Sequence, residues 1–283
     1  MTAVNYLESL NPLQYESVCS TEGPNLIIAG AGTGKTKVLT TRVAHIIDNN
    51  LAFPSQILCV TFTNKAAREM SERVQKLVSQ NMEKMPWMGT FHSIGAKIIR
   101  NHAEVIGLKQ SFTILDKDDQ LSLIKQIIKA ENLDQSQFSP KLIQSKIDHW
   151  KNKALNPNEI KSETLDNLVD EKSLSIYQIY QARLFEINCL DFGDLLLQCI
   201  NLFKVPDIHK RYSNNFKYIH VDEYQDTNAA QYKWLKLLGS HHKNVCCVGD
   251  DDQSIYSWRG AEVDNMLRFE KEFENAKVIR LKQ

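Results

Sequence analysis

Short apolar runs alternate with helical patterns near both ends of the chain. Each run is followed by a turn and then by a stretch in which apolar residues have helical spacing. This alternation predicts a parallel sheet with crossover helices, and hence an α/β fold. The predicted strands cover residues 25–29, 57–62, 216–221, 245–249 and 278–281. The predicted helices cover residues 34–48, 65–80, 228–238 and 263–273.

Residues 110–190 differ from their flanks, because they show helical spacing without strand alternation. The apolar stripes of this region consist of Leu121, Ile124 and Ile128, and then of Leu142, Ile143, Ile147 and Trp150. Asn156-Pro157 interrupts the pattern, and a further helix is predicted over about residues 174–187. We therefore expect an α-helical insertion domain at residues 111–189, within an α/β domain built from residues 1–110 and 190–283.

The composition is that of an ordinary globular protein, with 42% hydrophobic and 24% charged residues. The 34 basic residues balance the 34 acidic ones, so the net charge does not indicate a polyanionic partner. Residues 65–100 are richer in Lys and Arg, which is equally typical of a solvated helix face. We find no long apolar run and no secretory signal, and expect a cytoplasmic protein. The six cysteines form no Cys-x-x-Cys pair, so neither disulfides nor a zinc site are expected.

The segment from Leu26 to Thr36 has the pattern of a strand, a loop of small residues and the start of a helix. Glycines permit the tight loop, and backbone N–H groups at the helix start form a nest for phosphate oxygens. Lys35 is expected to meet the β and γ phosphates of a nucleotide, and the Thr36 hydroxyl to bind Mg²⁺. The pattern G-x-x-x-x-G-K-[ST] is missed only at its first position, where Ala29 stands. The nucleotide-binding residues expected in the loop are Ala29, Gly30, Ala31, Gly32, Thr33, Gly34, Lys35 and Thr36.

Two carboxylates, Asp222 and Glu223, follow the apolar run at residues 216–221. Ligands of open α/β sheets bind at the carboxyl ends of the strands. Asp222 is therefore the expected partner of Mg²⁺, and Glu223 the expected base that orients and deprotonates the attacking water. An Asp-Glu pair alone is often only a solvated turn. Its combination with the phosphate loop indicates an ATPase.

Three clusters near predicted strand ends have the chemistry of single-stranded nucleic-acid binding. They combine hydroxyls, amides, aromatic rings and a guanidinium, which can hold a backbone phosphate and stack a base. The clusters are Thr61, Phe62, Thr63 and Asn64, then Thr90, Phe91, His92 and Ser93, and finally Gln253, Tyr256, Trp258 and Arg259. Each has a plain alternative, since the aromatic rings can belong to the core and His92 can be a satisfied polar residue. Three clusters in one chain with a nucleotide site favour nucleic-acid binding.

From Leu10 to the last residue, the order of these motifs resembles the UvrD/Rep/PcrA superfamily 1 DNA helicases. Residues 10–14 resemble their adenine-reading Q motif, and residues 29–36, 60–70, 90–93, 221–228 and 248–261 resemble their motifs I, Ia, Ib, II and III. The resemblance implies a RecA-like P-loop NTPase domain that uses ATP and Mg²⁺. It also implies 3′-to-5′ unwinding, with single-stranded DNA, 3′-tailed duplex DNA and repair or replication proteins as partners.

The same resemblance implies roles for individual residues. Gln14 takes the adenine-contacting place, and Lys37 lies beside the nucleotide. Gln225 and Gln253 couple the γ-phosphate to DNA, and Gln253 joins Lys35 and Glu223 in the expected catalytic set. The residues that the resemblance places along the single strand are Phe62, Thr90, His92, Tyr256, Trp258 and Arg259.

The sequence departs from the family pattern in three respects. Lys37 stands where close relatives usually have Arg, which weakens a planar contact but keeps the charge. Gly193 stands where the family usually has a second Asp, which puts DNA-linked contacts there in doubt. After Gln283 the family continues with a second RecA-like domain, which supplies an adenine-stacking Tyr, arginines for the transition state and closure on ATP.

We therefore expect the front half of a helicase, which holds Mg²⁺ and ATP weakly and turns ATP over slowly. One alternative is a non-motor module or regulatory fragment that binds ATP and single-stranded DNA without helicase activity. Another is an unrelated P-loop ATPase with no DNA role.

Overall fold

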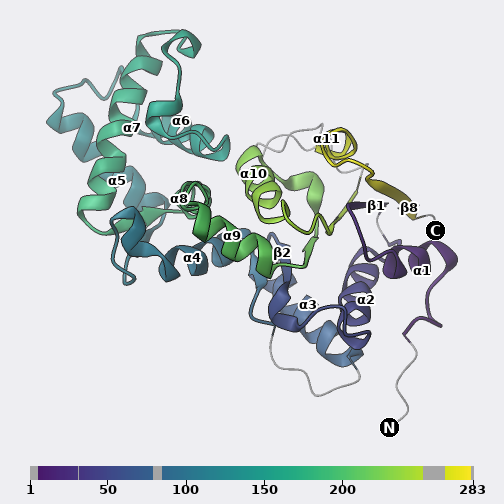
Figure 1. The fold of residues 1–283 in the computed structure, drawn as a ribbon. Coiled ribbons are helices and arrows are strands. Elements are labelled where there is room, and N and C mark those ends of the chain that lie inside the picture. The colour runs from purple at the N-terminus through teal and green to yellow at the C-terminus, as the bar shows by residue number, and fades with distance from the viewer. Residues whose placement is uncertain (1–5, 31, 79–84, 251–264, 282–283) are drawn as a thin grey trace. The chain divides into compact units, whose positions relative to one another are not determined.

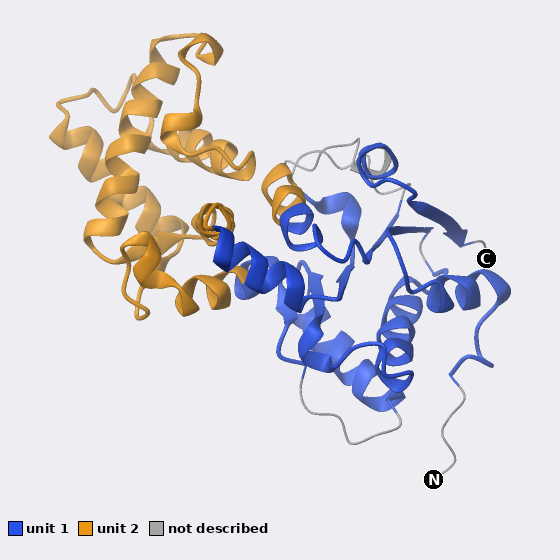
Figure 2. Ribbon diagram, in the orientation of Figure 1, with its two compact units in different colours: residues 1–94, 206–227, 235–283 blue, residues 95–205, 228–234 orange. Residues whose placement is uncertain are grey.

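The computed structural model describes residues 6–30, 32–78, 85–250 and 265–281. The chain divides into two compact units (Figure 2). Unit 1 comprises residues 1–94, 206–227 and 235–283, and unit 2 comprises residues 95–205 and 228–234. Unit 2 is larger than the predicted insertion at residues 111–189, because segments on both sides of that stretch pack with it.

Unit 1 is built on a six-stranded sheet whose described strand pairs are all parallel (Figure 1). The strand order is β3-β2-β6-β7-β1-β8. The strands are β1 (Asn25–Ala29), β2 (Ile57–Thr61), β3 (Met88–Thr90), β6 (Tyr218–Val221), β7 (Val245–Gly249) and β8 (Lys277–Leu281). The predicted parallel α/β fold is confirmed. β3 escapes prediction because three residues are too few to show an apolar pattern.

Three helices of unit 1 pack against one face of the sheet: α1 (Pro12–Cys19), α2 (Lys35–Asp48) and α3 (Asn64–Leu77). Val43 of α2 and Val248 of β7 are fully buried in the resulting core. Figure 1 shows α11 (Asn265–Glu272) on the opposite side of the strands from α2 and α3. The remaining helices of this part of the chain are α9 (Pro206–Asn215) and α10 (Ala229–Leu238), and α10 extends into unit 2.

His220 and Arg42 are buried polar residues beside this apolar core. His220 of β6 is paired in register with Cys59 and Cys246 on the neighbouring strands. Neither of its ring nitrogens has a hydrogen-bond partner among the described residues. Burial, together with the nearby cation of Arg42, lowers the pKa of His220 well below its usual value. The ring is therefore neutral in the folded protein at neutral pH.

We predict that His220 makes the folded protein sensitive to acid. Below about pH 6.5 the unfolded chain binds a proton at this ring, whereas the folded protein does not. The effect of His220 on the free energy of unfolding is therefore absent above this pH. As the pH falls below it, the free energy of unfolding decreases by up to about 1.4 kcal/mol per pH unit. His220→Gln should reduce the slope of the free energy of unfolding against pH between about pH 7 and about pH 5, measured by urea denaturation. Equal slopes in the two proteins would contradict this account.

Unit 2 is mainly helical. Its three long helices, α5 (Lys117–Ala130), α6 (Pro140–Asn152) and α7 (Leu168–Glu186), enclose a core that contains the fully buried Ile147 and Tyr177. Two shorter helices are α4 (Phe91–Asn101), which begins in unit 1, and α8 (Asp194–Leu202). β4 (Thr113–Leu115) and β5 (Cys189–Asp191) form a parallel pair that the apolar pattern of the sequence does not reveal.

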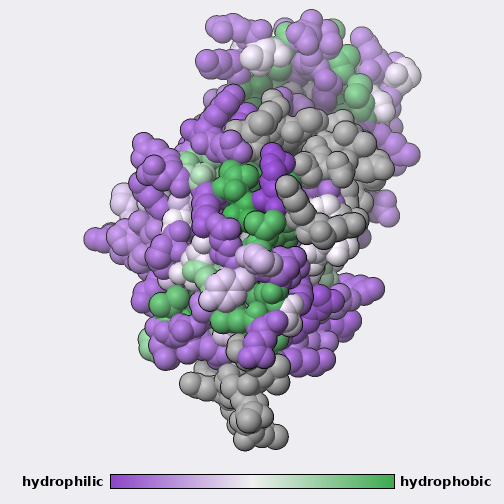
Figure 3. Space-filling model, turned by 90° about the vertical axis from the view of Figure 1, so that its right-hand side faces the viewer, coloured by the Kyte–Doolittle hydropathy of each residue, from purple (hydrophilic) through white to green (hydrophobic). Residues whose placement is uncertain are grey.

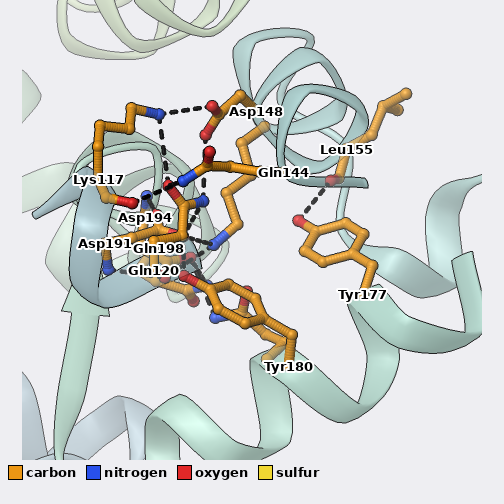
Figure 4. A network of polar contacts seen from close by, with 12 residues as sticks. Lys117, Gln120, Gln144, Asp148, Leu155, Tyr177, Tyr180, Asp191, Asp194 and Gln198 are labelled. Atoms are coloured by element: carbon orange, nitrogen blue, oxygen red, sulfur yellow. Dashed lines mark hydrogen bonds and ion pairs between the residues drawn. The ribbon is translucent and has the colours of Figure 1, made fainter. Parts of the chain in front are cut away.

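A buried ion network crosses unit 2 (Figure 4). Lys151 Nζ lies 2.7 Å from Asp191 Oδ2 and 2.9 Å from Asp194 Oδ2, and the lysine side chain is fully buried. The Tyr180 hydroxyl donates to Asp191 at 2.9 Å, and the Gln181 amide donates to Asp194 at 3.0 Å. Burial and the neighbouring Asp191 raise the pKa of Asp194. A buried charge without partners is strongly unfavourable, so this network constrains how α6, α7, β5 and α8 pack.

Gly193 lies against the aliphatic part of Lys151. A Cβ at position 193 would lie 2.9 Å from the Lys151 Cβ and 2.8 Å from its Cδ, which is closer than van der Waals contact. We predict that Gly193→Ala lowers the free energy of unfolding by about 1–3 kcal/mol, as overpacking of a filled interior does. Thermal unfolding followed by circular dichroism measures this. An unchanged Tm would mean that the lysine side chain moves aside without cost.

The surface carries mostly hydrophilic side chains on the face shown in Figure 3, with smaller apolar areas between them. Single exposed aromatic side chains occur in both units, for example Phe53 and Phe192, which are 73% and 47% exposed. Isolated exposed apolar residues are common in folded proteins. In the described ranges, every helix is too short or too polar to cross a membrane.

Candidate active site

The loop between β1 and α2 is shaped by glycines. Gly32 and Gly34 have φ angles of 80° and 91°, in the left-handed region that favours glycine. Thr33 fastens the loop, since its Oγ1 donates to the Gly30 carbonyl at 2.7 Å. Among the described residues, no side chain caps the N-terminus of α2. Its first N–H groups therefore point toward an anion site directly after Ala29, the last residue of β1.

Four residues form a closed ring beside this loop, through three side-chain contacts and one backbone N–H. Lys35 Nζ lies 3.0 Å from Asp250 Oδ2 and 3.7 Å from Glu223 Oε2. Gln225 completes the ring, because its Nε2 donates to Glu223 Oε2 at 2.7 Å and its Oε1 accepts from the Asp250 backbone N–H at 3.1 Å. The ring thus joins the start of α2 to the residues that follow β6 and β7. Parallel pairing makes this arrangement, since β1, β7 and β6 are neighbours with their carboxyl ends at one edge.

Asp222 and Glu223 follow β6 directly, and their environments differ. Asp222 is 5% exposed, and burial together with the adjacent Glu223 raises its pKa to about 6. Glu223 has a φ of 51°, an uncommon conformation for a residue with a side chain and one that is often found at functional sites. The Asp222 carboxylate and the Thr36 hydroxyl are hard oxygen donors, so their chemistry fits Mg²⁺.

Gln14 and Lys37 lie at the outer side of the loop. The Gln14 Nε2 donates to the Thr33 carbonyl at 3.0 Å, and its Oε1 accepts from the Asn11 backbone N–H at 3.1 Å. Lys37 is exposed and its Nζ donates to the Ser9 carbonyl at 2.6 Å. Gln14 thus links α1 to the loop, and Lys37 links α2 to the residues ahead of α1. The two helices also pack on each other.

A pocket of about 320 Å³ opens between the α1 segment, α2 and α3. Its lining residues are Tyr6, Ser9, Lys37, Thr40, Thr41, Arg73, Lys76 and Leu77. Arg73 and Lys76 give the pocket a cationic wall, and the charge of Arg73 partly offsets the rise in the pKa of Asp222. The sequence shows both residues only as part of the basic stretch at residues 65–100, because a charged side chain on a charge-rich helix carries no functional signal of its own.

The predicted DNA-binding residues of the first two clusters gather at the ends of β2 and β3. Thr61 and Thr90 are paired in register as the last residues of these strands. The rings of Phe62 and Phe91 follow them, with centroids 5.5 Å apart. His92 is partly exposed, and burial lowers its pKa, which keeps the ring neutral. The neighbouring strand ends therefore bring hydroxyls, aromatic rings and an imidazole to one edge of the sheet.

Two further residues of the first cluster have structural partners. Thr63 is the N-cap of α3 and accepts from the Ala66 backbone N–H at 3.1 Å, and Asn64 begins this helix. The predicted site residues Ala31, Gln253, Tyr256, Trp258 and Arg259 lie outside the described residues.

Asp250 is the residue of the ring that sequence reasoning does not select. It is 1% exposed and directly follows β7, the strand between β6 and β1. The sequence feature that could have identified Asp250 is its position, because it follows an apolar run as Asp222 does. Only the strand order makes it the partner of Lys35.

Comparisons with known proteins show the family to which the chain belongs. The sequence profile of the UvrD/REP helicase N-terminal domain family matches residues 10–274. The chain belongs to this family. The DNA helicase II of Rickettsia typhi is 51% identical over 283 residues, and a probable DNA helicase II homolog of Rickettsia felis is 49% identical over 282 residues. The ATP-dependent DNA helicase PcrA of Staphylococcus aureus is 49% identical over 278 residues.

The UvrD/REP match includes every residue of the ring and Gln14. The alignments to the two rickettsial proteins cover 99% of this chain and 43% of each relative. The alignment to the staphylococcal protein covers 98% of this chain and 38% of that relative. The chain thus spans less than half the length of these members of the family.

We predict that Asp250→Asn destabilises the nucleotide-free protein. It leaves the ammonium of Lys35, whose side chain is only 12% exposed, without its nearest carboxylate. Removing one partner of a largely buried charge pair should cost about 1–3 kcal/mol. Glu69→Gln is the matched control, because the Lys65–Glu69 pair is exposed and its loss should leave Tm unchanged. Equal melting temperatures for Asp250→Asn and the unaltered protein would contradict the prediction.

Proposed function

We propose that this chain is the N-terminal, ATP- and DNA-binding half of an ATP-dependent DNA helicase that moves 3′ to 5′ along single-stranded DNA. The observation that carries the proposal is the ring around Lys35, in which a cation, a carboxylate base and a glutamine meet beside an open helix N-terminus. Membership of the UvrD/REP family and the helicase names of three relatives support it. Because the chain spans 38–43% of those relatives, unwinding is assigned to the whole protein.

The proposed chemistry is hydrolysis of the terminal phosphate of ATP. Lys35 and the first N–H groups of α2 hold the β and γ phosphates. Glu223 orients a water molecule and takes its proton as the water oxygen bonds to the γ-phosphorus, while the bond to the departing ADP oxygen breaks. Thr36 and Asp222 would hold Mg²⁺, which would supply positive charge next to the phosphates. Gln225 is bound to both Glu223 and the Asp250 backbone, so it is placed to respond to the γ-phosphate.

The proposed path of the single strand follows the ends of β2 and β3. At that edge the half-buried rings of Phe62 and His92 suit stacking of bases, and the exposed Thr63 and Asn64 suit binding of the sugar-phosphate backbone. Thr61, Thr90 and Phe91 are buried. The residues assigned to this surface are Thr61, Phe62, Thr63, Asn64, Thr90, His92, Tyr256, Trp258 and Arg259. Gln253 links the surface to the γ-phosphate in this proposal. Residues 1–110 and 190–283 are assigned to the RecA-like domain, and residues 111–189 to the helical insertion.

The proposal is tested by Mg²⁺-dependent ATP turnover of this protein, with and without single-stranded DNA. We expect residues 1–283 alone to turn over ATP below about 0.1 per second, about 100-fold below a typical enzyme, because the family resemblance assigns the transition-state arginines to a second domain outside these residues. Binding of Mg²⁺-ATP should remain measurable, and Glu223→Gln should abolish the residual turnover while keeping that binding.

The possible results separate the hypotheses. DNA-stimulated turnover of many per second, abolished by Glu223→Gln, would show a self-sufficient motor and contradict the expected dependence on a second domain. Fast ATP turnover that does not depend on DNA would favour an ATPase without a DNA role. Binding of ATP and single-stranded DNA without any turnover would favour a non-motor module.

A further inference from the structure

Arg42 lies in α2 with its guanidinium enclosed by the protein. The residue is 1% exposed. Its Nη1 donates to the Ser17 carbonyl at 2.6 Å and its Nη2 to the Thr21 carbonyl at 3.1 Å. Nε has no hydrogen-bond partner among the described residues, and no carboxylate in those ranges forms an ion pair with Arg42. Burying a cation that binds only backbone carbonyls costs free energy. The cost is offset if those carbonyls would otherwise lack hydrogen-bond partners.

The two carbonyls belong to the end of α1. Ser17 lies in the last turn of this helix, and Thr21 follows its C-cap residue Ser20. The last carbonyls of a helix lack partners within the helix and carry partial negative charge. α1 has no basic residue in its own last turn. Arg42 therefore supplies, from the neighbouring helix, the positive charge and the donors that this helix end requires.

The same short helix carries Gln14 over the phosphate loop. Both polar atoms of the Gln14 amide form hydrogen bonds, Nε2 with the Thr33 carbonyl and Oε1 with the Asn11 N–H. Gly34 approaches it so closely that a Cβ there would lie 2.9 Å from Gln14 Nε2. A small displacement of α1 would therefore move Gln14 relative to the loop that holds the phosphates.

The other polar links between α1 and its surroundings are more exposed. Lys277 Nζ lies 2.8 Å from Glu16 Oε1 and 2.8 Å from Ser20 Oγ, and the Lys277 and Glu16 side chains are both 45% exposed. Lys37, which binds the Ser9 carbonyl ahead of α1, is also exposed. Exposed ion pairs contribute little to holding a helix in place. Arg42 is thus the buried polar link between α1 and the helix that begins with Lys35.

We propose that Arg42 is a positioning residue for nucleobase recognition, which fixes α1 and its Gln14 relative to the phosphate loop. The inference rests on the proposed function and on the adenine-contacting place that the family resemblance implies for Gln14. Lys35 and Arg42 are about two turns apart on one helix. The phosphates and the base are therefore both located by α2, directly through Lys35 and indirectly through Arg42 and α1.

The role requires arginine rather than a charge alone. The planar guanidinium directs separate N–H groups at two carbonyls, whereas a lysine ammonium is a compact charge that lacks this fork. Arg42→Lys keeps the charge and much of the aliphatic stem, so it tests geometry more than folding. Arg42→Gln is a second variant without charge, whose amide can bind one of the two carbonyls.

The experiment measures equilibrium binding of ATP, GTP and inorganic tripolyphosphate by calorimetry in the presence of Mg²⁺. In Arg42→Lys, we expect the preference for ATP over GTP to fall at least about fivefold, which is the effect of losing roughly one hydrogen bond. Tripolyphosphate affinity should stay within about twofold, because Lys35 and the loop are unchanged. Arg42→Gln should change in the same direction.

Two controls separate positioning from stability. Gln14→Ala should reproduce the loss of base preference. Gly193→Ala should lose stability through unit 2 and keep the base preference. Equal losses for all three ligands in Arg42→Lys, or an unchanged preference for ATP, would overturn the role of Arg42. If the unaltered protein binds none of the three ligands, the proposed function itself fails, and the role of Arg42 fails with it.

Discussion

Parallel pairing of β6, β7 and β1 is the constraint on which the candidate active site depends. Parallel strands run in one direction, so their carboxyl ends share one edge of the sheet. The register sets Val221 beside Cys247 and Ile28 beside Gly249, so that the residues that follow these strands can meet at Lys35. A slip of one residue would send the alternate side chains to the other face and open the ring.

The helix that begins at this edge extends the constraint into the core. α2 presents Lys35 at its open N-terminus and Arg42 in its buried middle. Through Arg42, the end of α1 is fastened in an otherwise apolar layer, close to the neutral ring of His220. The buried guanidinium of Arg42 needs its two carbonyl partners, so this part of the core specifies one arrangement of the two helices more sharply than apolar packing does.

Unit 2 relies on the same principle at a different place. Lys151 is fully buried between Asp191 and Asp194, and its stem fills the space in which a side chain at position 193 would lie. Gly193, which departs from the expected family pattern, leaves room for the Lys151 side chain. The glycine therefore has a structural role inside unit 2, since a side chain at this position would meet Lys151.

The sequence by itself determined the parallel α/β class, five of the six strands of the main sheet, and the family. Strands buried on both faces are mostly apolar, and a phosphate loop is contiguous, so both leave a local signal. Only the tertiary structure decided that Asp250 partners Lys35 across 215 residues, that Arg42 holds α1, and that Lys151 needs Gly193. These contacts depend on strand order and helix packing, which bring distant residues together without leaving a pattern in the local sequence.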